Sequence, residues 1–493
     1  MGCSSSSPRS TDRDEGICVI EIIKCEHLPN MDVGSLTDAY VKCRFIDTID
    51  PNIHDSVKLK TSVQWNSLNP VYHAFLAFPL FPNEADTVEF KIVDEDVMNA
   101  NDDIGRAEVQ FTHLLSRIGE EVKLDVRLKK NLKSVDGEPT TITVRLVKLS
   151  RNEKPKKIRK EFFVIRHGES IWNESQEGKS VKGMVSQYDH ELTKLGISQA
   201  QDFNERWNEV KRDPKLDKHG DLKAFLSASS VFSSPLTRAT QTALLTCKGH
   251  PSLLADPLVL LRNLREVKNF GSFDTVGQYT GTEIESNVKD KLLRDLGDEA
   301  DEDLLDVEID PFDAFDCWWT PLQQKEKKEH VKNRFTELWA YLRYGTHAQT
   351  AILVGHSHFF RHMCKEHMSP EFRKRDPEWT NQLDKSKLDN GGCLRVTVEW
   401  DGAKGPMEPP VIHAARLVFG SKLAGSETGT EDGGNSDADV DTPTPLSPFS
   451  RPSMKGFKDY DVSGIETGSN SISASVSGVD EASADVSSIM LSF

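Results

Sequence analysis

Short runs of alternating apolar and polar residues fill the early part of the chain. The clearest runs lie at 17–23, 40–45, 87–93 and 141–147. They are rich in β-branched and aromatic side chains, and turn signals such as Asn69-Pro70 separate them. Alternation over this length predicts strands that bury one face. Several such strands joined by turns predict an antiparallel β-sandwich over residues 16–149.

The pattern changes at residue 161, where apolar runs of strand length begin to alternate with helical segments. The runs at 162–165 and 352–354 are the strongest of these strands. Alternation of strands and helices predicts a layered α/β domain with a mostly parallel sheet over residues 161–420. A chain of 493 residues is long enough for several domains.

Three segments lack this periodicity. Residues 1–15 are small and polar, residues 150–160 form a basic linker, and residues 421–493 are rich in Ser, Gly and Asp. The last segment has too few apolar residues to offset ordering entropy, so we expect it to be disordered. It holds 12 acidic and 4 basic residues, which gives −8 of the net charge of −17. This acidic balance excludes a bulk affinity for nucleic acid.

The first residues predict attachment to a membrane. Gly2, Cys3 and Ser6 fit the myristoylation pattern, with Cys3 available for palmitoylation. Two acyl chains give stable anchoring, whereas one holds only marginally. The alternative is a disordered serine-rich tip. No apolar run approaches the ~20 residues that span a bilayer, and the cysteines show no CxxC spacing. We therefore expect a lipid-anchored protein at the cytoplasmic face of a membrane, with the plasma membrane as the first candidate, and without a transmembrane helix.

Carboxylates gather in two loops of the predicted sandwich. Asp32 and Asp38 lie between the first two strands, and Asp94, Asp96 and Asp102 follow the run that ends at residue 93. These charges would repel one another unless a hard cation joined them, and oxygen-rich flexible sites suit Ca²⁺. The alternative is that these aspartates are ordinary turn residues.

Residues 16–149 resemble a C2 domain. The resemblance rests on the segments 28–32, 37–42, 65–72 and 94–105. It implies that the five aspartates hold Ca²⁺ and that the domain binds anionic membrane phospholipids when calcium is present.

Two histidines end apolar strands in the second predicted domain. His167 lies in Arg166-His167-Gly168 after one strand, and His356 follows the strand at 352–354. Both should lie at the carboxyl edge of a parallel sheet, where open α/β folds bind ligands. Ser234 and Pro235 predict a helix start, which places Arg238 in a first turn that favours an anion.

Residues 161–419 resemble the histidine phosphatase superfamily, which includes the cofactor-dependent phosphoglycerate mutases. The segments that carry the resemblance are 166–170, 189–196, 231–242 and 352–358. It implies that His167 takes the phosphoryl group as phosphohistidine, while Arg166, Arg238 and His356 clamp the phosphate oxygens. Asn173 is a further candidate contact to the phosphate. The mechanism needs no catalytic metal.

A general acid must protonate the leaving oxygen, and the sequence leaves its identity open. The segment 264–271 resembles the family segment that carries this carboxylate, which makes Glu266 the first candidate. Asp189 and Glu191 are the alternatives.

These observations favour a membrane-associated phosphatase that hydrolyses phosphomonoesters. A mutase is less favoured, because residues 174–183 lack the Phe-Thr-Gly-Trp run of the glycolytic mutases. A non-catalytic adaptor that binds phosphorylated partners is the alternative from another class. The phosphorylated substrate remains open among small molecules, lipids and proteins.

Overall fold

The computed structural model describes residues 16–424, except 33, 47–56, 81, 84–85, 97–99, 152–155, 186, 269–272, 298–301 and 323. Gly2 and Cys3 therefore lie outside the described residues, as does the expected disordered tail from 425 onward. The sandwich and the α/β domain belong to one unit of the chain, residues 1–427.

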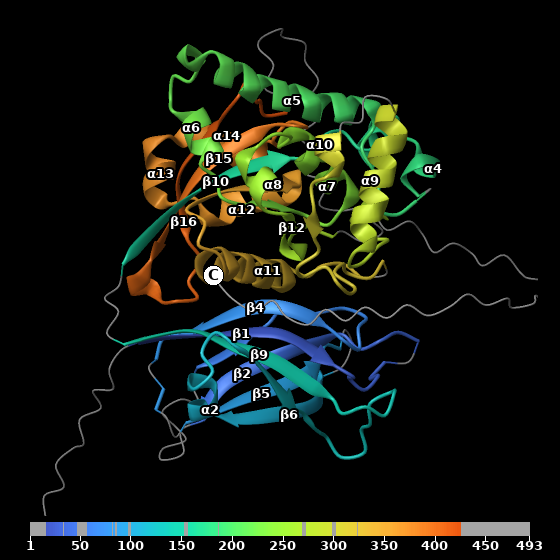
Figure 1. Cartoon of the computed structure of the whole chain (residues 1–493), viewed down its shortest axis with the longest axis vertical. Helices are drawn as coiled ribbons and strands as arrows, with labels where there is room; N and C mark the ends of the chain where they lie inside the picture. Colours follow the sequence, from blue (N-terminus) through green and yellow to red (C-terminus); the bar gives the residue numbers. More distant parts are fainter. Residues whose placement is uncertain are drawn as a thin grey trace, which may run out of the picture. The chain divides into compact units, whose positions relative to one another are not determined.

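Two antiparallel sheets form the N-terminal domain, as the alternation predicted (Figure 1). Their strand orders are β4-β1-β9-β7 and β3-β2-β5-β6-β8. On β2, Val41, Cys43 and Phe45 are buried, while Lys42 between them is exposed. The buried faces of both sheets share one apolar core. The alternation in the sequence therefore decides which side chains enter the sandwich.

The sandwich elements have the following bounds: β1 Gly16–Glu26, β2 Ala39–Ile46, β3 Lys58–Lys60, β4 Val71–Phe78, β5 Thr87–Asp94, β6 Asp102–Gln110, α2 Phe111–Leu115, β7 Glu121–Asp125, β8 Arg127–Leu128 and β9 Thr141–Arg151.

A seven-stranded sheet in the order β13-β12-β11-β14-β10-β15-β16 forms the second domain. The neighbours from β13 to β10 pair in parallel, whereas β15 and β16 pair antiparallel at one edge. The mostly parallel α/β fold expected from the sequence is thus confirmed.

The strands and principal helices of this domain have the following bounds: β10 Lys157–Arg166, α3 Ile171–Glu177, α4 Val181–Met184, α5 Lys194–Arg212, α6 Asp221–Leu226, β11 Val231–Ser233, α7 Thr237–Thr246, α8 Pro251–Ala255, β12 Leu258–Leu260, α9 Glu283–Leu296, α10 Glu302–Leu305, β13 Ile309–Asp310, α11 Lys328–Ala340, β14 Thr350–Gly355, α12 Ser357–His367, α13 Pro370–Arg375, α14 Pro377–Lys385, β15 Cys393–Asp401 and β16 Val411–Leu417. A π-helix, η5, covers Tyr341–Gly345, and short 3-10 helices cover Pro214–Leu216, Arg262–Leu264, Phe273–Thr275 and Gly402–Lys404.

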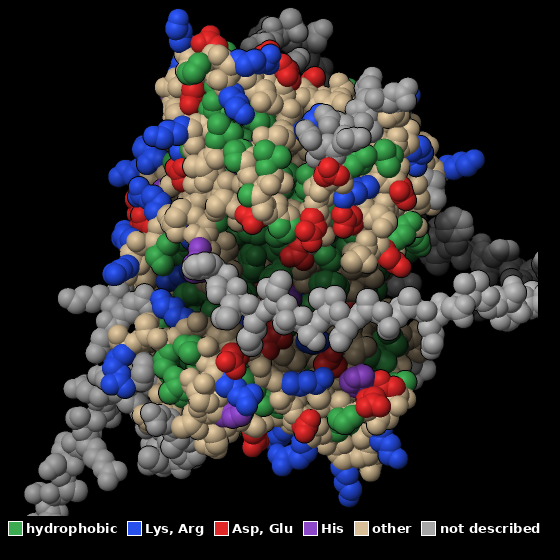
Figure 2. Space-filling view, viewed as in Figure 1, with side chains coloured by type: hydrophobic (Ala, Val, Ile, Leu, Met, Phe, Trp, Pro, Cys, Tyr) green, Lys and Arg blue, Asp and Glu red, His purple; other side chains and the backbone are tan. Residues whose placement is uncertain are grey.

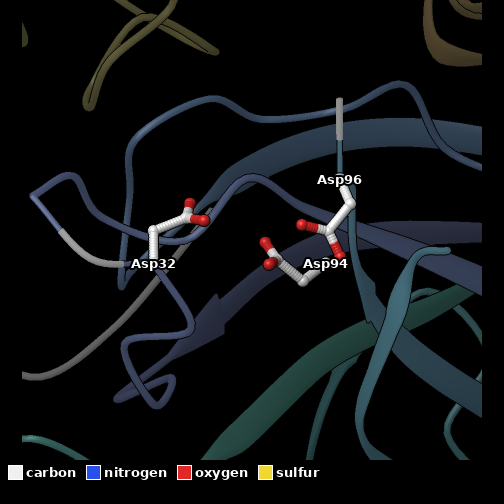
Figure 3. Close-up of side chains that lie close together, drawn as sticks. All are labelled: Asp32, Asp94 and Asp96. Atoms are coloured by element: carbon white, nitrogen blue, oxygen red, sulfur yellow. The ribbon is translucent and has the colours of Figure 1, made fainter. Parts of the chain in front are cut away.

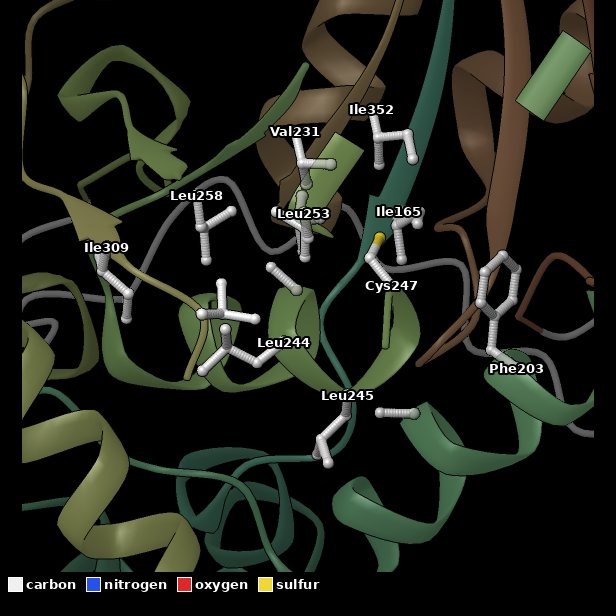
Figure 4. Close-up of a cluster of buried hydrophobic side chains, with 14 of the residues drawn as sticks. Ile165, Phe203, Val231, Leu244, Leu245, Cys247, Leu253, Leu258, Ile309 and Ile352 are labelled. Atoms are coloured by element: carbon white, nitrogen blue, oxygen red, sulfur yellow. The ribbon is translucent and has the colours of Figure 1, made fainter. Parts of the chain in front are cut away.

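Both faces of the parallel sheet are buried. On β10, Phe163 and Ile165 enter the core beneath α5 and α7, whereas Phe162 and Val164 enter the core on the opposite face. Figure 4 shows Ile165 and Ile352 among the side chains of the first core. Each fully buried side chain of this size contributes roughly 1.5–3 kcal/mol. A strand that is apolar at every position is what a sheet covered on both faces requires.

The start of α7 and the bounds of the linker differ from the expectations. Helix α7 begins at Thr237 with Leu236 as its N-cap, so the prediction that Ser234 caps this helix is wrong. The helix start is instead satisfied by Asp189, whose carboxylate accepts hydrogen bonds from the backbone N–H and hydroxyl of Thr237, both at 2.8 Å. Within the expected linker, Lys157 already lies in β10.

Buried polar contacts join the sandwich to the α/β domain. Glu337 on α11 accepts hydrogen bonds from the backbone N–H and the hydroxyl of Ser62, both at 2.6 Å. It also pairs with Arg262 at 3.3 Å. Arg262 donates to the carbonyl of Val71 on β4 at 2.8 Å and pairs with Asp313 at 3.7 Å. Each charge in this group has a partner, as burial requires.

Charges of both signs are mixed on the surface shown in Figure 2. Lys and Arg side chains gather over α13, whose last turn contains Arg373, Lys374 and Arg375. Among the residues that the structure describes, no helix has the length and apolar character needed to cross a membrane.

Candidate active site

The sheet register brings the two motif histidines together. His167 follows β10 and His356 follows β14, and these parallel strands pair Arg166 with Gly355. The ring centroids of the two histidines lie 5.0 Å apart. Their side chains are buried, with residue exposures of 4% and 0%. The two imidazoles thus form one site at the carboxyl edge of the sheet, as the sequence predicted.

Both imidazoles are held in the neutral form. Burial, followed by the nearby Arg238, lowers the pKa of His167 and of His356 well below the ordinary histidine value. Nδ1–H of His167 donates to the carbonyl of Gly168 at 2.6 Å. Because a carbonyl only accepts, the proton lies on Nδ1 and the lone pair lies on Nε2. His167 therefore presents a nucleophilic nitrogen.

One nitrogen of His356 is free to meet a ligand. Nε2 of His356 lies 2.9 Å from the hydroxyl of Ser234. Nδ1 is buried and has no hydrogen-bond partner within the described part of the chain. Buried polar atoms in folded proteins are normally paired, so this nitrogen is suited to an oxygen of an incoming group.

Two buried arginines flank the histidines. Arg238 donates to the backbone carbonyl of Asp274 at 2.7 Å, and its second Nη lies 3.4 Å from the Asp274 carboxylate. Arg166 donates to the carbonyl of Leu388 at 2.8 Å. Nε of Arg166 is buried and lacks a partner among the described residues. Two fixed guanidinium groups beside a neutral imidazole favour the binding of a phosphate.

Backbone N–H groups at the start of α12 hold the Glu266 carboxylate in place. One carboxylate oxygen accepts from the backbone N–H groups of Phe359 and Val267, both at 2.9 Å, and the other accepts from His358 at 3.2 Å. Glu266 is also close enough to Arg166 to stabilise its charge. This carboxylate therefore lies beside one of the two arginines of the site.

The two alternative acids bind other residues. Asp189 caps α7 through Thr237, and Glu191 pairs with Lys291 at 3.3 Å and with Arg294 at 2.9 Å. Asn173 is the third residue of α3, where its carbonyl oxygen accepts from the backbone N–H of Ser170 at 3.2 Å. The structure thus brings Arg166, Arg238 and His356 around His167, and it places Glu266 near Arg166.

Three supporting residues were not anticipated from the sequence in these roles. Ser234 bonds His356, Asp274 holds Arg238, and the Thr242 hydroxyl accepts from the backbone N–H of Gly168 at 3.0 Å. Thr242 follows Arg238 by one helical turn, so helical spacing was the available signal for it. Asp274 lies in no motif that points to Arg238.

The acidic loops of the sandwich also converge. Figure 3 shows the carboxylates of Asp32, Asp94 and Asp96 pointing toward one another, and their oxygens lie within 4.8 Å. Asp38 and Asp102 lie outside this tight group. Asp38 borders it, with one oxygen accepting from the backbone N–H of Asn66 at 2.7 Å, and Asp102 is paired with Asp94 across β5 and β6.

The donor set fits a hard cation. Burial raises the pKa of Asp38 to about 7 and that of Asp94 to about 6, with neighbouring aspartates adding to both shifts. Burial and then Asp96 raise the pKa of Asp32. Carboxylates that repel one another in this way, with oxygen as the only ligand atom, suit Ca²⁺.

Comparison with known proteins supports both domains. Residues 16–126 match the C2 domain model, and residues 162–382 match the model of the histidine phosphatase superfamily, branch 1. The chain carries a C2 domain followed by a histidine phosphatase domain. The two resemblances noted in the sequence are therefore confirmed.

Individual relatives cover only parts of the chain. Rat synaptotagmin-3 is 34% identical over 96 residues, which is 19% of this chain and 16% of the relative. A C2 domain of plant extended synaptotagmin 1 aligns with 29% of this chain and 99% of its own, at 18% identity and a TM-score of 0.23. Mycobacterial hydrolase 1 aligns with 52% of this chain and 96% of its own, at 15% identity and a TM-score of 0.28.

Proposed function

We propose that this protein is a phosphatase that hydrolyses phosphomonoesters through a phosphohistidine on His167. The observation that carries the proposal is the group of side chains around His167. It combines a neutral imidazole, two buried arginines, and two buried nitrogens without partners among the described residues, Nε of Arg166 and Nδ1 of His356. A phosphate oxygen would satisfy each of these nitrogens.

In the first step the lone pair on Nε2 of His167 forms a bond to phosphorus. The bond from phosphorus to the leaving oxygen breaks, and this oxygen takes a proton from Glu266. Arg166, Arg238 and His356 hold the three remaining oxygens, where charge is greatest in the transition state.

In the second step a water molecule replaces the alcohol. The water gives a proton to the Glu266 carboxylate, its oxygen bonds to phosphorus, and the bond from phosphorus to His167 breaks. Inorganic phosphate leaves and Glu266 is again protonated. Glu266 is favoured because it lies near Arg166, whereas Asp189 holds the start of α7 through Thr237 and Glu191 pairs with two basic side chains.

Incubation of the protein with para-nitrophenyl phosphate radiolabelled on phosphorus, followed by rapid quenching without acid, tests this mechanism. We expect label on the protein that is labile in acid and stable in alkali, together with release of inorganic phosphate. Label that passes to an added alcohol faster than to water would indicate a mutase. Binding of the phosphate ester with neither labelling nor release would indicate an adaptor.

The N-terminal domain supports recruitment of this activity to a membrane. We infer that Gly2 and Cys3 carry acyl chains and that the C2 domain binds anionic phospholipids when its aspartates hold Ca²⁺. In that state Asp32, Asp94 and Asp96 would hold the ion, and Asp38 and Asp102 would complete the acidic end of the domain. Bound Ca²⁺ would neutralise these carboxylates and would supply a positive site for lipid headgroups.

Calcium is expected to increase binding of unacylated protein to vesicles that contain phosphatidylserine, because it removes the repulsion between the aspartates and the anionic surface. Cosedimentation with and without chelator measures the effect. Asp94→Asn together with Asp96→Asn should abolish the calcium dependence, whereas Asp136→Asn, an exposed aspartate in the 129–140 loop, should leave it unchanged. Equal sedimentation in calcium and in chelator would contradict the proposal.

A further inference from the structure

A group of histidine, arginine and lysine side chains lies near Arg166 and takes no part in the proposed mechanism. They are His358 and Arg361 on α12, together with Lys387 in the segment that follows α14. All three side chains are partly buried. They cannot be regarded as a freely solvated surface.

Two sets of hydrogen bonds place the segments that carry these residues beside the candidate active site. Arg166 donates to the carbonyl of Leu388, the neighbour of Lys387, and the Asn390 side chain donates to the carbonyl of His167 at 3.2 Å. The backbone N–H of His358 donates to Glu266. The residue segments that carry Lys387 and His358 are therefore tied directly to Arg166, His167 and Glu266.

The basic residues also lie against one another. One Nη of Arg361 lies 3.4 Å from Nδ1 of His358, and the other donates to the carbonyl of Lys385 at 3.4 Å. Burial, then Arg166 and Arg361, lowers the pKa of Lys387. Burial lowers the pKa of His358 to about 4, so this ring is a neutral hydrogen-bonding group. The positive charge comes from Arg361, Lys387 and Arg166, and the two arginines act on Lys387 more strongly than Glu266 offsets them.

The neighbouring carboxylates have other roles. Glu266 is bound by backbone N–H groups and is the proposed acid. Asp384 forms an ion pair with Arg373, and Asp389 is exposed at the solvent side of the segment. Among the described residues, neither Lys387 nor Arg361 forms an ion pair with a carboxylate. An anionic ligand would relieve this excess of positive charge.

We propose that His358, Arg361 and Lys387 form a second anion subsite, so that the preferred substrates carry another anionic group beside the phosphate that is transferred. The group is a carboxylate or a second phosphate. This inference rests on the proposed phosphatase function and specifies the class of its substrate.

Matched substrate pairs test the subsite. O-phosphoserine and O-phosphoethanolamine differ by one carboxylate, and propanediol bisphosphate and monophosphate differ by one phosphate. We expect kcat/KM to be about tenfold or more higher for the more anionic member of at least one pair, because a charge-assisted hydrogen bond is worth about 1.5–3 kcal/mol. The pair that shows the preference identifies whether the second group is a carboxylate or a phosphate.

Variants locate the preference. Lys387→Met and Arg361→Met keep the aliphatic stem and remove the charge, so each should reduce the ratio of kcat/KM between the members of that pair toward one. Lys365→Met removes the same charge from an exposed position on α12 and should leave the ratio unchanged. Circular dichroism melting curves verify that each variant folds.

The outcomes separate the two proposals. Equal kcat/KM within both pairs, with phosphate released from all four compounds, would overturn the subsite and leave the phosphatase function intact. A preference that both Lys387→Met and Arg361→Met retain would also overturn it. Release of phosphate from none of the compounds, nor from para-nitrophenyl phosphate, would instead be a failure of the proposed phosphatase function.

Discussion

Replacing His167 with alanine is expected to lower kcat for para-nitrophenyl phosphate by about ten thousand-fold, since removal of a covalent nucleophile eliminates the chemical step itself. The structure explains why no neighbour should replace it. His356 is the other imidazole of the facing pair, but its Nε2 is bonded to the Ser234 hydroxyl and its Nδ1 is the nitrogen assigned to a phosphate oxygen. Phosphate release at saturating substrate measures the loss.

Two further measurements separate loss of the nucleophile from loss of phosphate binding or of folding. Binding of vanadate should survive in His167→Ala, because Arg166 and Arg238 remain in place. His219→Ala, at an exposed histidine, is the matched control and should retain full activity. A His167→Ala variant that kept more than about one hundredth of kcat would place the nucleophile elsewhere.

The pH dependence follows from the same burial. The pKa of His167 in the fold lies well below its ordinary value, so the neutral form predominates above that lowered pKa. Activity should therefore show no loss from protonation of His167 between pH about 7 and about 6, where an ordinary histidine would begin to titrate. An NMR titration in which the His167 ring gains its proton with a midpoint near about 6.5 would contradict a neutral buried nucleophile.

Local patterns in the sequence predicted the architecture, because the apolar positions of each strand indicate which of its faces are buried. The run at 162–165 is apolar at every position and lies in a sheet covered on both faces, whereas β2 alternates and lies in a sandwich. The pair of His167 and His356 also followed from local reasoning, since parallel strands end at one edge.

Contacts between distant segments were not predictable in this way. Ser234 was expected to cap α7, but its hydroxyl lies against His356 and the helix start is occupied by Asp189, 48 residues before Thr237. The partnership of Arg238 with Asp274 likewise depends on how a later segment folds back over α7. Periodicity and motif spacing contain no information about such pairings, because they depend on three-dimensional packing.

The contact between the C2 domain and the catalytic domain is of this kind, and it leads to the second large expected effect. Replacing Glu337 with alanine should lower the free energy of unfolding by about 3–5 kcal/mol, the usual result when one partner of a buried ion pair is removed. Glu337 is 5% exposed and accepts hydrogen bonds from Ser62 and Arg262. Without it, Arg262 retains Asp313 as its only carboxylate partner among the described residues.

Glu329→Ala is the matched control on the same helix. Glu329 pairs with Lys60 of the C2 domain at 2.9 Å, but its side chain is 68% exposed. An exposed pair of this kind contributes about 0–1 kcal/mol, so the two variants remove the same chemical group from the same interface with different burial. Chemical denaturation of both variants measures the difference. Equal stability of the two would mean that the buried contacts of Glu337 do not hold the domains together.

Calorimetry adds a result that loss of stability alone would not give. Ser62 belongs to the C2 domain, whereas Arg262 and Glu337 belong to the catalytic domain, so Glu337 bonds across the interface as well as within its own domain. If this residue couples the domains, Glu337→Ala should separate one unfolding transition into two, and Ca²⁺ should then raise the melting temperature of the C2 transition only, because ligand binding stabilises the unit that binds it. A single transition that moves as a whole with Ca²⁺ would show that the remaining contacts suffice for coupling.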